Sequence, residues 1–175
     1  MIRKPENIVR VLGWSCRDSR FKGRLAVYAP YFLANVPQEL RAYVGWDNDG
    51  DLAKTFTALL ARQAYVACAW LGGRALALAW LREISPLAAE AHFLICQRKP
   101  KAVLEAGREF IRQAERRYPS LTALVPRPFI GAKRLAEALG FQFLAKVPKV
   151  CALKSMGKIA DGLLYSYQAK KGFII

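Results

Sequence analysis

Two apolar runs of similar length, 64–71 and 74–82, follow one another along the chain with Gly72-Gly73 between them. Together they approach the length of a membrane-spanning helix, but Arg74 near the centre would cost about 2.5–3.5 kcal/mol on insertion scales. A Gly-Gly pair is instead typical of a two-residue hairpin turn, because both glycines adopt positive φ easily. The pattern therefore predicts two antiparallel strands and no membrane segment.

The segment after this hairpin changes from a strand pattern to a helix pattern and back. Apolar residues at 89–96 predict a third strand, and those at 121–125 predict a fourth. Between them, apolar residues recur every three or four positions from 102 to 118, which predicts an amphipathic helix. Gly107 lies on its apolar stripe, where glycine is costly, so we expect it to let the helix lie close to the sheet.

A second helix is predicted at 129–139, because Gly140 is the residue type expected just beyond a helix C-terminus. Two further apolar runs, 141–147 and 163–168, predict the last two strands of the sheet. A strand, a helix and a strand in this order imply parallel pairing with a right-handed crossover. The predicted fold class is α/β (α+β): an antiparallel meander that leads into one βαβ unit of a mixed sheet.

The first sixty residues carry a weaker pattern. A helix is predicted around 52–60, with Asp49 or Asp51 as its N-cap. The acidic run 47–51 is not the start of an EF-hand loop, because Ala58 stands where the bidentate glutamate would be needed. We therefore interpret this run as a loop and a helix cap.

Composition and charge narrow the class of protein. Apolar residues make up 54% and charged residues 23% of the chain, which excludes a disordered protein, and the length suits a single domain, 1–175. Lys and Arg number 28 against 13 Asp and Glu, and most of the net charge of +15 falls in 97–175. We expect an anionic partner there, such as nucleic acid, an anionic membrane or a phosphate-rich small molecule; the alternative is a merely basic surface.

Cysteine and histidine usage favours a reducing, cytoplasmic setting. The four cysteines form no Cys-x-x-Cys pair, and His92 has no second histidine with which to hold zinc. Cys68 and Cys96 lie in apolar runs, where free cysteine behaves as a small buried hydrophobe. The first ten residues lack the apolar run of a secretory signal. We therefore expect no disulfide and no structural metal.

The most informative turn, Gln97–Ala102 with the sequence QRKPKA, joins the third strand to the long helix. Arg98, Lys99 and Lys101 crowd the helix N-terminus, where the helix dipole disfavours each cation by about 0.3–1 kcal/mol. A bound phosphate would offset this cost, because backbone N–H groups, the dipole and the cationic side chains would all meet one anion. The alternative is a solvated basic turn.

The order of these elements, with QRKPKA at 97–102 and RLAEALGF at 134–141, resembles the GNAT superfamily of acyl-CoA-dependent N-acetyltransferases. Within that superfamily the sequence looks most like small members encoded by phages or prophages, and the resemblance covers about 64–143. It implies a GNAT-like mixed sheet with a splayed parallel strand pair. The pyrophosphate of acetyl-CoA would bind the turn at 97–102, and its pantetheine arm would enter between 92–96 and 121–125.

The resemblance also implies the cofactor-binding residues. A backbone N–H of Leu94 or Ile95 would donate to the thioester carbonyl of acetyl-CoA, and Lys133 would reach its phosphates. The full predicted set is Leu94, Ile95, Gln97, Arg98, Lys99, Pro100, Lys101, Ala102, Phe129 and Lys133.

Three residues depart from the family pattern. Pro100 stands at the first turn glycine and lacks an N–H, although proline suits the first turn of a helix. Phe129 stands where an asparagine commonly opens the second helix. Ala136 stands where a tyrosine often protonates the leaving thiolate. Coenzyme A binding survives these changes more readily than efficient catalysis.

Acetyl transfer to an amine needs a base and a donor that polarises the thioester carbonyl. Glu90 and His92 lie two residues apart, so they share one face of the third strand. Each has a structural alternative, as a solvated carboxylate and as a histidine satisfied on the sheet surface. Glu83 is a further candidate base, and Tyr165 or Tyr167 could replace the missing acid. The predicted catalytic residues are Glu90, His92 and Tyr165.

Three functions remain open. The first is a slow N-acetyltransferase that acts on an unidentified amine, with at most weak, non-specific affinity for nucleic acid. The second is a catalytically degenerate GNAT-fold phage structural or assembly protein, with a phage or host protein as its partner and a virion-associated location. The third is a basic nucleic-acid-binding module that stacks bases on tryptophan. The candidate stacking residues are Trp14, Trp46, Trp70 and Trp80.

Overall fold

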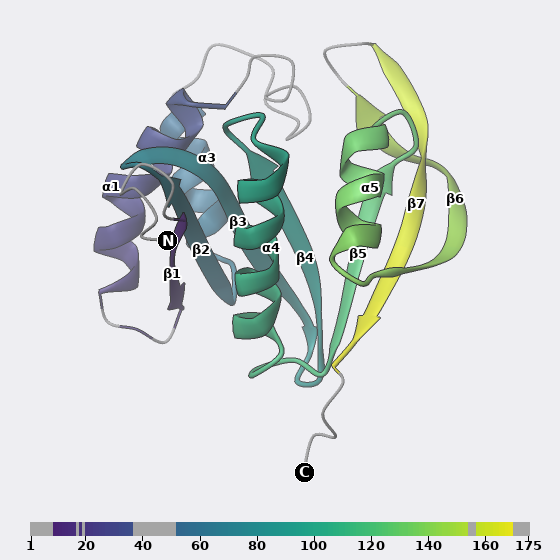
Figure 1. Ribbon diagram of the computed structural model, residues 1–175, viewed down its shortest axis with the longest axis horizontal. Helices are drawn as coiled ribbons and strands as arrows, with labels where there is room; N and C mark the ends of the chain where they lie inside the picture. The colour runs from purple at the N-terminus through teal and green to yellow at the C-terminus, as the bar shows by residue number, and fades with distance from the viewer. Residues whose placement is uncertain (1–8, 17, 19, 37–51, 154–156, 170–175) are drawn as a thin grey trace, which may run out of the picture.

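The computed structural model describes residues 9–16, 18, 20–36, 52–153 and 157–169, which form a seven-stranded mixed sheet flanked by helices (Figure 1). The strand order is β1-β2-β3-β4-β5-β7-β6. The strands are β1 (Val9–Ser15), β2 (Tyr65–Leu71), β3 (Arg74–Ser85), β4 (Ala88–Ile95), β5 (Ser120–Pro126), β6 (Gln142–Leu153) and β7 (Lys158–Gln168). The helices are α1 (Phe21–Ala34), α3 (Leu52–Leu60), α4 (Pro100–Ala114) and α5 (Ile130–Ala138).

The predicted glycine hairpin is confirmed. Strands β2 and β3 pair antiparallel, with Leu71 opposite Arg74, and Gly72 and Gly73 have φ values of 56° and 79°. The segment that approaches the length of a membrane span is therefore two strands of the sheet. Within the described ranges, none of the helices is long and apolar enough to cross a membrane.

The predicted βαβ unit and its splayed strands are also confirmed. Strand β4 continues through α4 into β5, and the two strands run parallel. They pair over three positions, the last of which is Glu90 with Thr122. Beyond that pair the two strands separate (Figure 1). We call this region the β4–β5 opening.

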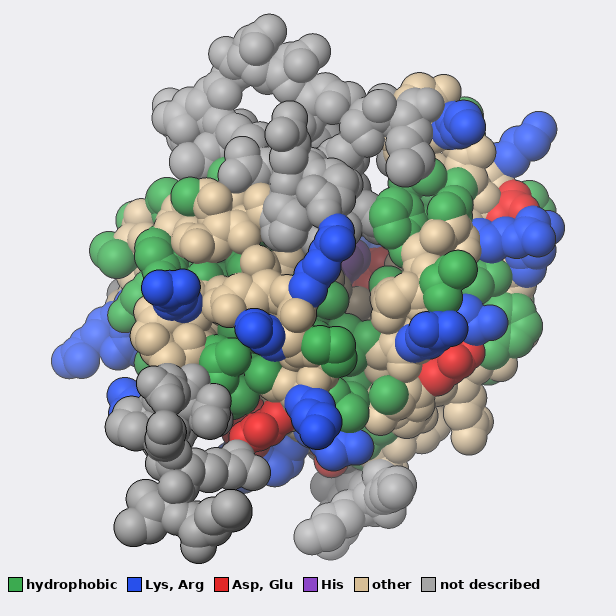
Figure 2. All heavy atoms as spheres, turned by 45° about the horizontal axis from the view of Figure 1, so that its top comes forward, with side chains coloured by type: hydrophobic (Ala, Val, Ile, Leu, Met, Phe, Trp, Pro, Cys, Tyr) green, Lys and Arg blue, Asp and Glu red, His purple; other side chains and the backbone are tan. Residues whose placement is uncertain are grey.

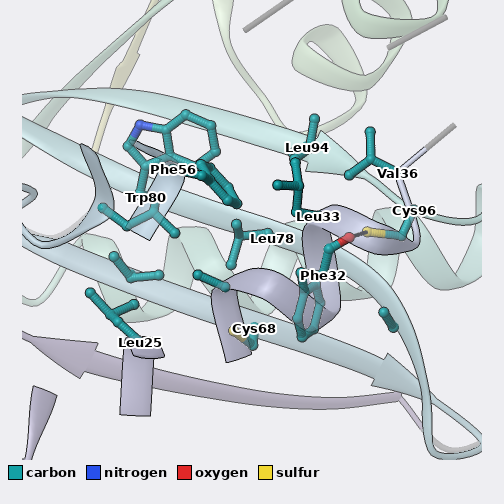
Figure 3. Packing of buried hydrophobic residues seen from close by; sticks show 14 of the residues in the cluster. Leu25, Phe32, Leu33, Val36, Phe56, Cys68, Leu78, Trp80, Leu94 and Cys96 are labelled. Atoms are coloured by element: carbon teal, nitrogen blue, oxygen red, sulfur yellow. Dashed lines mark hydrogen bonds between the residues drawn. The ribbon is translucent and has the colours of Figure 1, made fainter. Parts of the chain in front are cut away.

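Helices cover both faces of the sheet, and alternate residues of β3 point to the two layers. Phe32 of α1 and Phe56 of α3 join Trp80 of β3 in one buried cluster (Figure 3). The thiol of Cys96 donates to Phe32 O at 3.6 Å and so ties the end of β4 to α1. On the other face, Leu81 of β3 lies in the cluster that contains α4 and α5 residues such as Phe110.

Three predictions about α4 are wrong in detail. The helix begins at Pro100, two residues early, because proline needs no N–H acceptor in the first turn. It ends at Ala114, before 118, because the chain turns there and carries Tyr118 into the core. Gly107 does not make room for the sheet: a Cβ there would lie 2.9 Å from Leu139 Cδ2, so the glycine accommodates the end of α5.

The C-terminal strands are longer than predicted, and two N-terminal elements were missed. Strand β6 continues past Pro148 through an irregularity in its pairing with β7. Strand β1 and helix α1 gave no clear pattern, and Pro30 inside α1 is a helix-breaking signal. The predicted caps Asp49 and Asp51 lie outside the described residues, whereas the helix at 52–60 is confirmed.

The cysteines yield a first testable prediction. Burial raises the pKa of the Cys68 thiol and raises that of Cys96 to about 12, whereas Cys16 is exposed. Because the thiolate is the nucleophile, we expect Ellman's reagent to label Cys16 rapidly in the native protein, and Cys68 and Cys96 only after denaturation. Replacing Cys16 with Ser should remove the rapid phase. Equal native reactivity of all thiols would contradict this burial.

Candidate active site

The candidate site lies at the β4–β5 opening, and the fold brings two helix N-termini beside it. Because α4 and α5 follow the carboxyl ends of the parallel strands β4 and β5, both helices begin at the same end of the sheet. Figure 2 shows a hollow there, with histidine and acidic side chains inside it and Lys and Arg side chains around its rim. The sequence has one histidine, His92.

The edge of β4 that faces this opening carries backbone donors. The Cys96 N–H donates to Leu76 O of β3 at 2.8 Å. Because N–H directions alternate along a strand, the Leu94 N–H also points to β3, and those of Phe93 and Ile95 point to the opening. Of the two predicted carbonyl donors, Ile95 therefore faces the opening and Leu94 does not. Phe93 was missed, because this assignment needs the strand register.

Glu90 lies at the narrow end of the opening and is 9% exposed, so it is not a solvated carboxylate. Its Oε2 lies 3.6 Å from His92 Nε2 and accepts a hydrogen bond from Arg82 on the neighbouring strand. The His92 imidazole and the Arg82 guanidinium hold the pKa of the Glu90 carboxyl below its usual range, against the opposing effect of burial. Glu90 is therefore ionised at neutral pH.

His92 is held flat against an aromatic ring. It lies opposite Trp80 in the sheet, and the two rings stack with centroids 5.0 Å apart and planes 8° from parallel. Trp80 is in turn fixed by an edge contact with Phe56 of α3. The structure thus brings Glu90 and His92 together, in a fixed orientation, on the face of the sheet that carries α1 and α3.

The structure does not bring Tyr165 together with Glu90 and His92. Tyr165 lies in the cluster with α4 and α5, on the opposite face, and is 0% exposed. Its hydroxyl donates to Glu137 Oε1 at 3.4 Å, and burial raises its pKa. Glu83 and Tyr167 are also engaged elsewhere: Glu83 accepts a hydrogen bond from Tyr118, and Tyr167 donates one to Glu115.

The turn before α4 has the features of an anion site. The Gln97 side-chain amide donates to Ala75 O, and the Lys99 N–H donates to Gln97 O at 2.9 Å, which fixes the turn on β3. Lys99 is the N-cap, without a side-chain cap, and the first turn holds no acidic residue. The N–H groups of Lys101 and Ala102 lie in that turn, where a helix provides no acceptor of its own. The predicted cations Arg98, Lys99 and Lys101 are exposed.

The start of α5 lies across the opening from this turn. Phe129 is its half-buried N-cap, and its first turn also lacks acidic residues. The Lys133 N–H donates to Phe129 O, and the exposed Lys133 ammonium lies 3.9 Å from Glu137 Oε1. Ala136 is buried and offers no polar group. Lys133, one of the two exposed cations of α5 with Arg134, is thus suited to an anion.

Comparison with known proteins supports the fold. No protein-family model matches the sequence, and no curated protein is significantly similar to it. Among solved structures, yncA, a putative acetyltransferase from Salmonella typhimurium with bound acetyl-CoA, has a TM-score of 0.63 at 17% identity, over 95% of this chain and 96% of its own. RimL, a ribosomal L7/L12 α-N-protein acetyltransferase in complex with coenzyme A, has a TM-score of 0.65 at 12% identity, over 91% and 94% of the two chains.

A third structure agrees with these two. The ribosomal-protein-S5-alanine acetyltransferase from Vibrio fischeri has a TM-score of 0.69 at 12% identity, over 93% of each chain. The likeness extends over nearly the whole of each protein. The chain therefore has the GNAT acetyltransferase fold that its sequence predicts.

Proposed function

We propose that this protein is an N-acetyltransferase that transfers the acetyl group of acetyl-CoA to an amine. One observation carries the proposal: the β4–β5 opening combines inward N–H groups of β4, the Glu90–His92 pair and the cationic start of α4. Each is a group that acyl transfer from a thioester with a phosphate tail requires. The likeness to acetyltransferases with bound acetyl-CoA and coenzyme A supports the same activity.

The residues present fit acetyl-CoA as the donor. Its pyrophosphate would bind the N–H groups of Lys101 and Ala102 and the side chains of Lys99 and Lys101, with the positive end of the α4 dipole behind them. Pro100 supplies no N–H, so we expect the affinity to be reduced but retained. The N–H of Phe93 or Ile95 would donate to the thioester carbonyl.

The chemistry then follows from the charges at the site. The amine nitrogen bonds to the acetyl carbon while the carbon–sulfur bond breaks, and Glu90 or His92 accepts the proton that the amine loses. Neither residue considered for protonating the coenzyme A thiolate is placed to do so, because Ala136 is apolar and Tyr165 is buried against Glu137. The transfer should therefore be slow.

Charge reversal at the α4 turn tests the donor site. The double variant Lys99→Glu, Lys101→Glu should weaken acetyl-CoA binding by roughly 10–100-fold in calorimetry, because a charge-assisted hydrogen bond contributes about 1.5–3 kcal/mol. It should also flatten the salt dependence of binding, because fewer ionic contacts remain to be screened. The control is Arg62→Glu, Arg116→Glu, with the same change in charge at two other exposed positions. Equal binding by the two double variants would rule out this turn.

A second candidate function keeps the fold without turnover. The buried Ala136 and the engagement of Tyr165 with Glu137 favour a degenerate GNAT-fold protein, such as a phage structural or assembly component. Such a protein would bind coenzyme A and acetylate none of a panel of amines. The nucleic-acid-binding alternative is less favoured, because Trp14 and Trp80 are buried and Trp70 packs edge-on against Tyr28 and Phe32. The fourth candidate, Trp46, lies outside the described residues.

A further inference from the structure

Arg82 is a charged residue at the site that the proposed chemistry does not use. It lies directly opposite Glu90 on the neighbouring strand β3, and its Nη2 donates to Glu90 Oε2. Its side chain is nevertheless 65% exposed, whereas Glu90 is nearly buried. The Glu90 carboxylate therefore lies inside the opening, while most of the Arg82 side chain faces the solvent.

The Arg82 contact is less complete than that of another arginine in the same protein. Arg112 of α4 binds Glu109 through two atoms, with its Nε 2.7 Å from Oε2 and its Nη2 2.5 Å from Oε1. Arg82 contacts Glu90 through Nη2 alone, and among the described residues Glu90 is its partner. A guanidinium has five N–H donors in a planar fork that matches a carboxylate. The fork of Arg82 is thus largely available.

The exposed donors lie on the side of the sheet where Glu90 and His92 lie. Arg82 and Glu90 are direct cross-strand neighbours, as are Trp80 and His92 one step along, so all four share one face. Thr122 of β5 and Ser166 of β7 continue this row beyond Glu90 and add two hydroxyl groups. A positive and a negative group therefore lie side by side at the site of the incoming amine.

We propose that the acceptor is a small amine that also carries a carboxylate, such as a free α-amino acid, and that Arg82 binds this carboxylate. This inference rests on the proposed acetyltransferase function. The acceptor's ammonium group would meet Glu90 and His92, while its carboxylate would meet the Arg82 fork. A cationic amine without that carboxylate would bring a second positive charge beside Arg82 and be repelled. Arg82 is then a residue that determines specificity, and Glu90 remains the base.

Paired acceptors test this inference. We would compare L-amino acids of different side chains with their amides, which retain the amine but lack the carboxylate, at equal concentrations of the free amine. The kcat/KM should be higher for the acids. Arg82→Gln should raise KM for the acids by roughly 10–100-fold, as expected for loss of a charge-assisted bidentate contact, and should not raise KM for the amides. Arg82→Lys should lie between the two.

The matched control is Arg112→Gln, which removes an arginine that is also paired with glutamate but lies on α4 beside Val9 and Val11 of β1. It should leave both classes of acceptor unchanged. Equal use of acids and amides by the native protein, or an equal loss for both in Arg82→Gln, would overturn the proposal. Circular dichroism of each variant separates such a loss from misfolding.

A direct binding measurement keeps this proposal separate from the proposed function. Calorimetric titration of the amino acids and amides, with and without coenzyme A, needs no turnover. Preferential binding of the acids that Arg82→Gln abolishes would support the proposal even if transfer is undetectable. If acids and amides bind equally, or if neither binds, the proposed role of Arg82 is refuted. The proposed acetyltransferase function is tested separately, by acetyl-CoA binding and acetyl transfer.

Discussion

Replacement of Glu90 with Gln should slow acetyl transfer by ~10²–10⁴-fold, the range that general base catalysis contributes. The amide keeps the shape of the side chain and still accepts a hydrogen bond from Arg82, but it cannot take a proton from the amine. Acetyl-CoA binding should be unchanged, because Glu90 is not among the groups that would hold the phosphates. Initial rates and calorimetry with the same protein sample measure both quantities.

The pH profile sharpens this prediction. Because His92 and Arg82 lower the pKa of Glu90, its carboxylate persists as the pH falls through the ordinary glutamate range. The base is therefore lost only in more acidic solution than for an unperturbed glutamate, whose pKa is about 4.3. Between neutral and mildly alkaline pH, the rate should rise as the free amine becomes more abundant.

Comparison with His92→Asn identifies the base. If Glu90 accepts the proton, Glu90→Gln should lose far more activity than His92→Asn. The His92→Asn variant loses the imidazole contact with Glu90 Oε2 but leaves the Glu90 carboxylate in place. The reverse order would assign the role to His92. An undiminished rate in both variants would mean that neither residue accepts the proton and would remove the main support for this mechanism.

Local signals in the sequence were sufficient for the core of the fold. Gly72-Gly73 specified a hairpin because few sequences tolerate two consecutive positive φ values. The end of α5 was equally clear, since the residue after Leu139 is Gly140 with φ of 92°. Strand β1 lacked such a signal, because its sequence VRVLGWS has Gly13 within the strand, where glycine is unfavourable.

The candidate site depended on information that the sequence does not contain. Glu90 and His92 share a face because they are two residues apart on one strand, which the sequence does show. The face of Tyr165 depends instead on its strand lying between β5 and β6, out of chain order, and on the register with Ala123 and Phe143. Arg82 was missed for the same reason, because its place opposite Glu90 depends on the register of β3 with β4.

A large loss of stability should come from replacing Phe110, which connects α4 to the strands beside the opening. Its ring is buried and lies 6.2 Å from the ring centroids of both Tyr65 on β2 and Phe93 on β4. Phe110→Ala should lower the free energy of unfolding by ~3–5 kcal/mol, through lost burial and the cavity left behind. Urea unfolding followed by circular dichroism should show a lower midpoint with an unchanged m-value.

Phe143 provides the matched control, because it is an exposed phenylalanine on the edge strand β6. Phe143→Ala should cost less than about 1 kcal/mol, as is usual for a surface position. Since Phe93 also contributes a backbone N–H to the β4–β5 opening, loosening its packing against Phe110 should weaken acetyl-CoA binding at temperatures where the variant is still folded. Equal destabilisation by the two substitutions would mean that α4 is not packed on the sheet as described, and the position assigned to the phosphate-binding turn would fall with it.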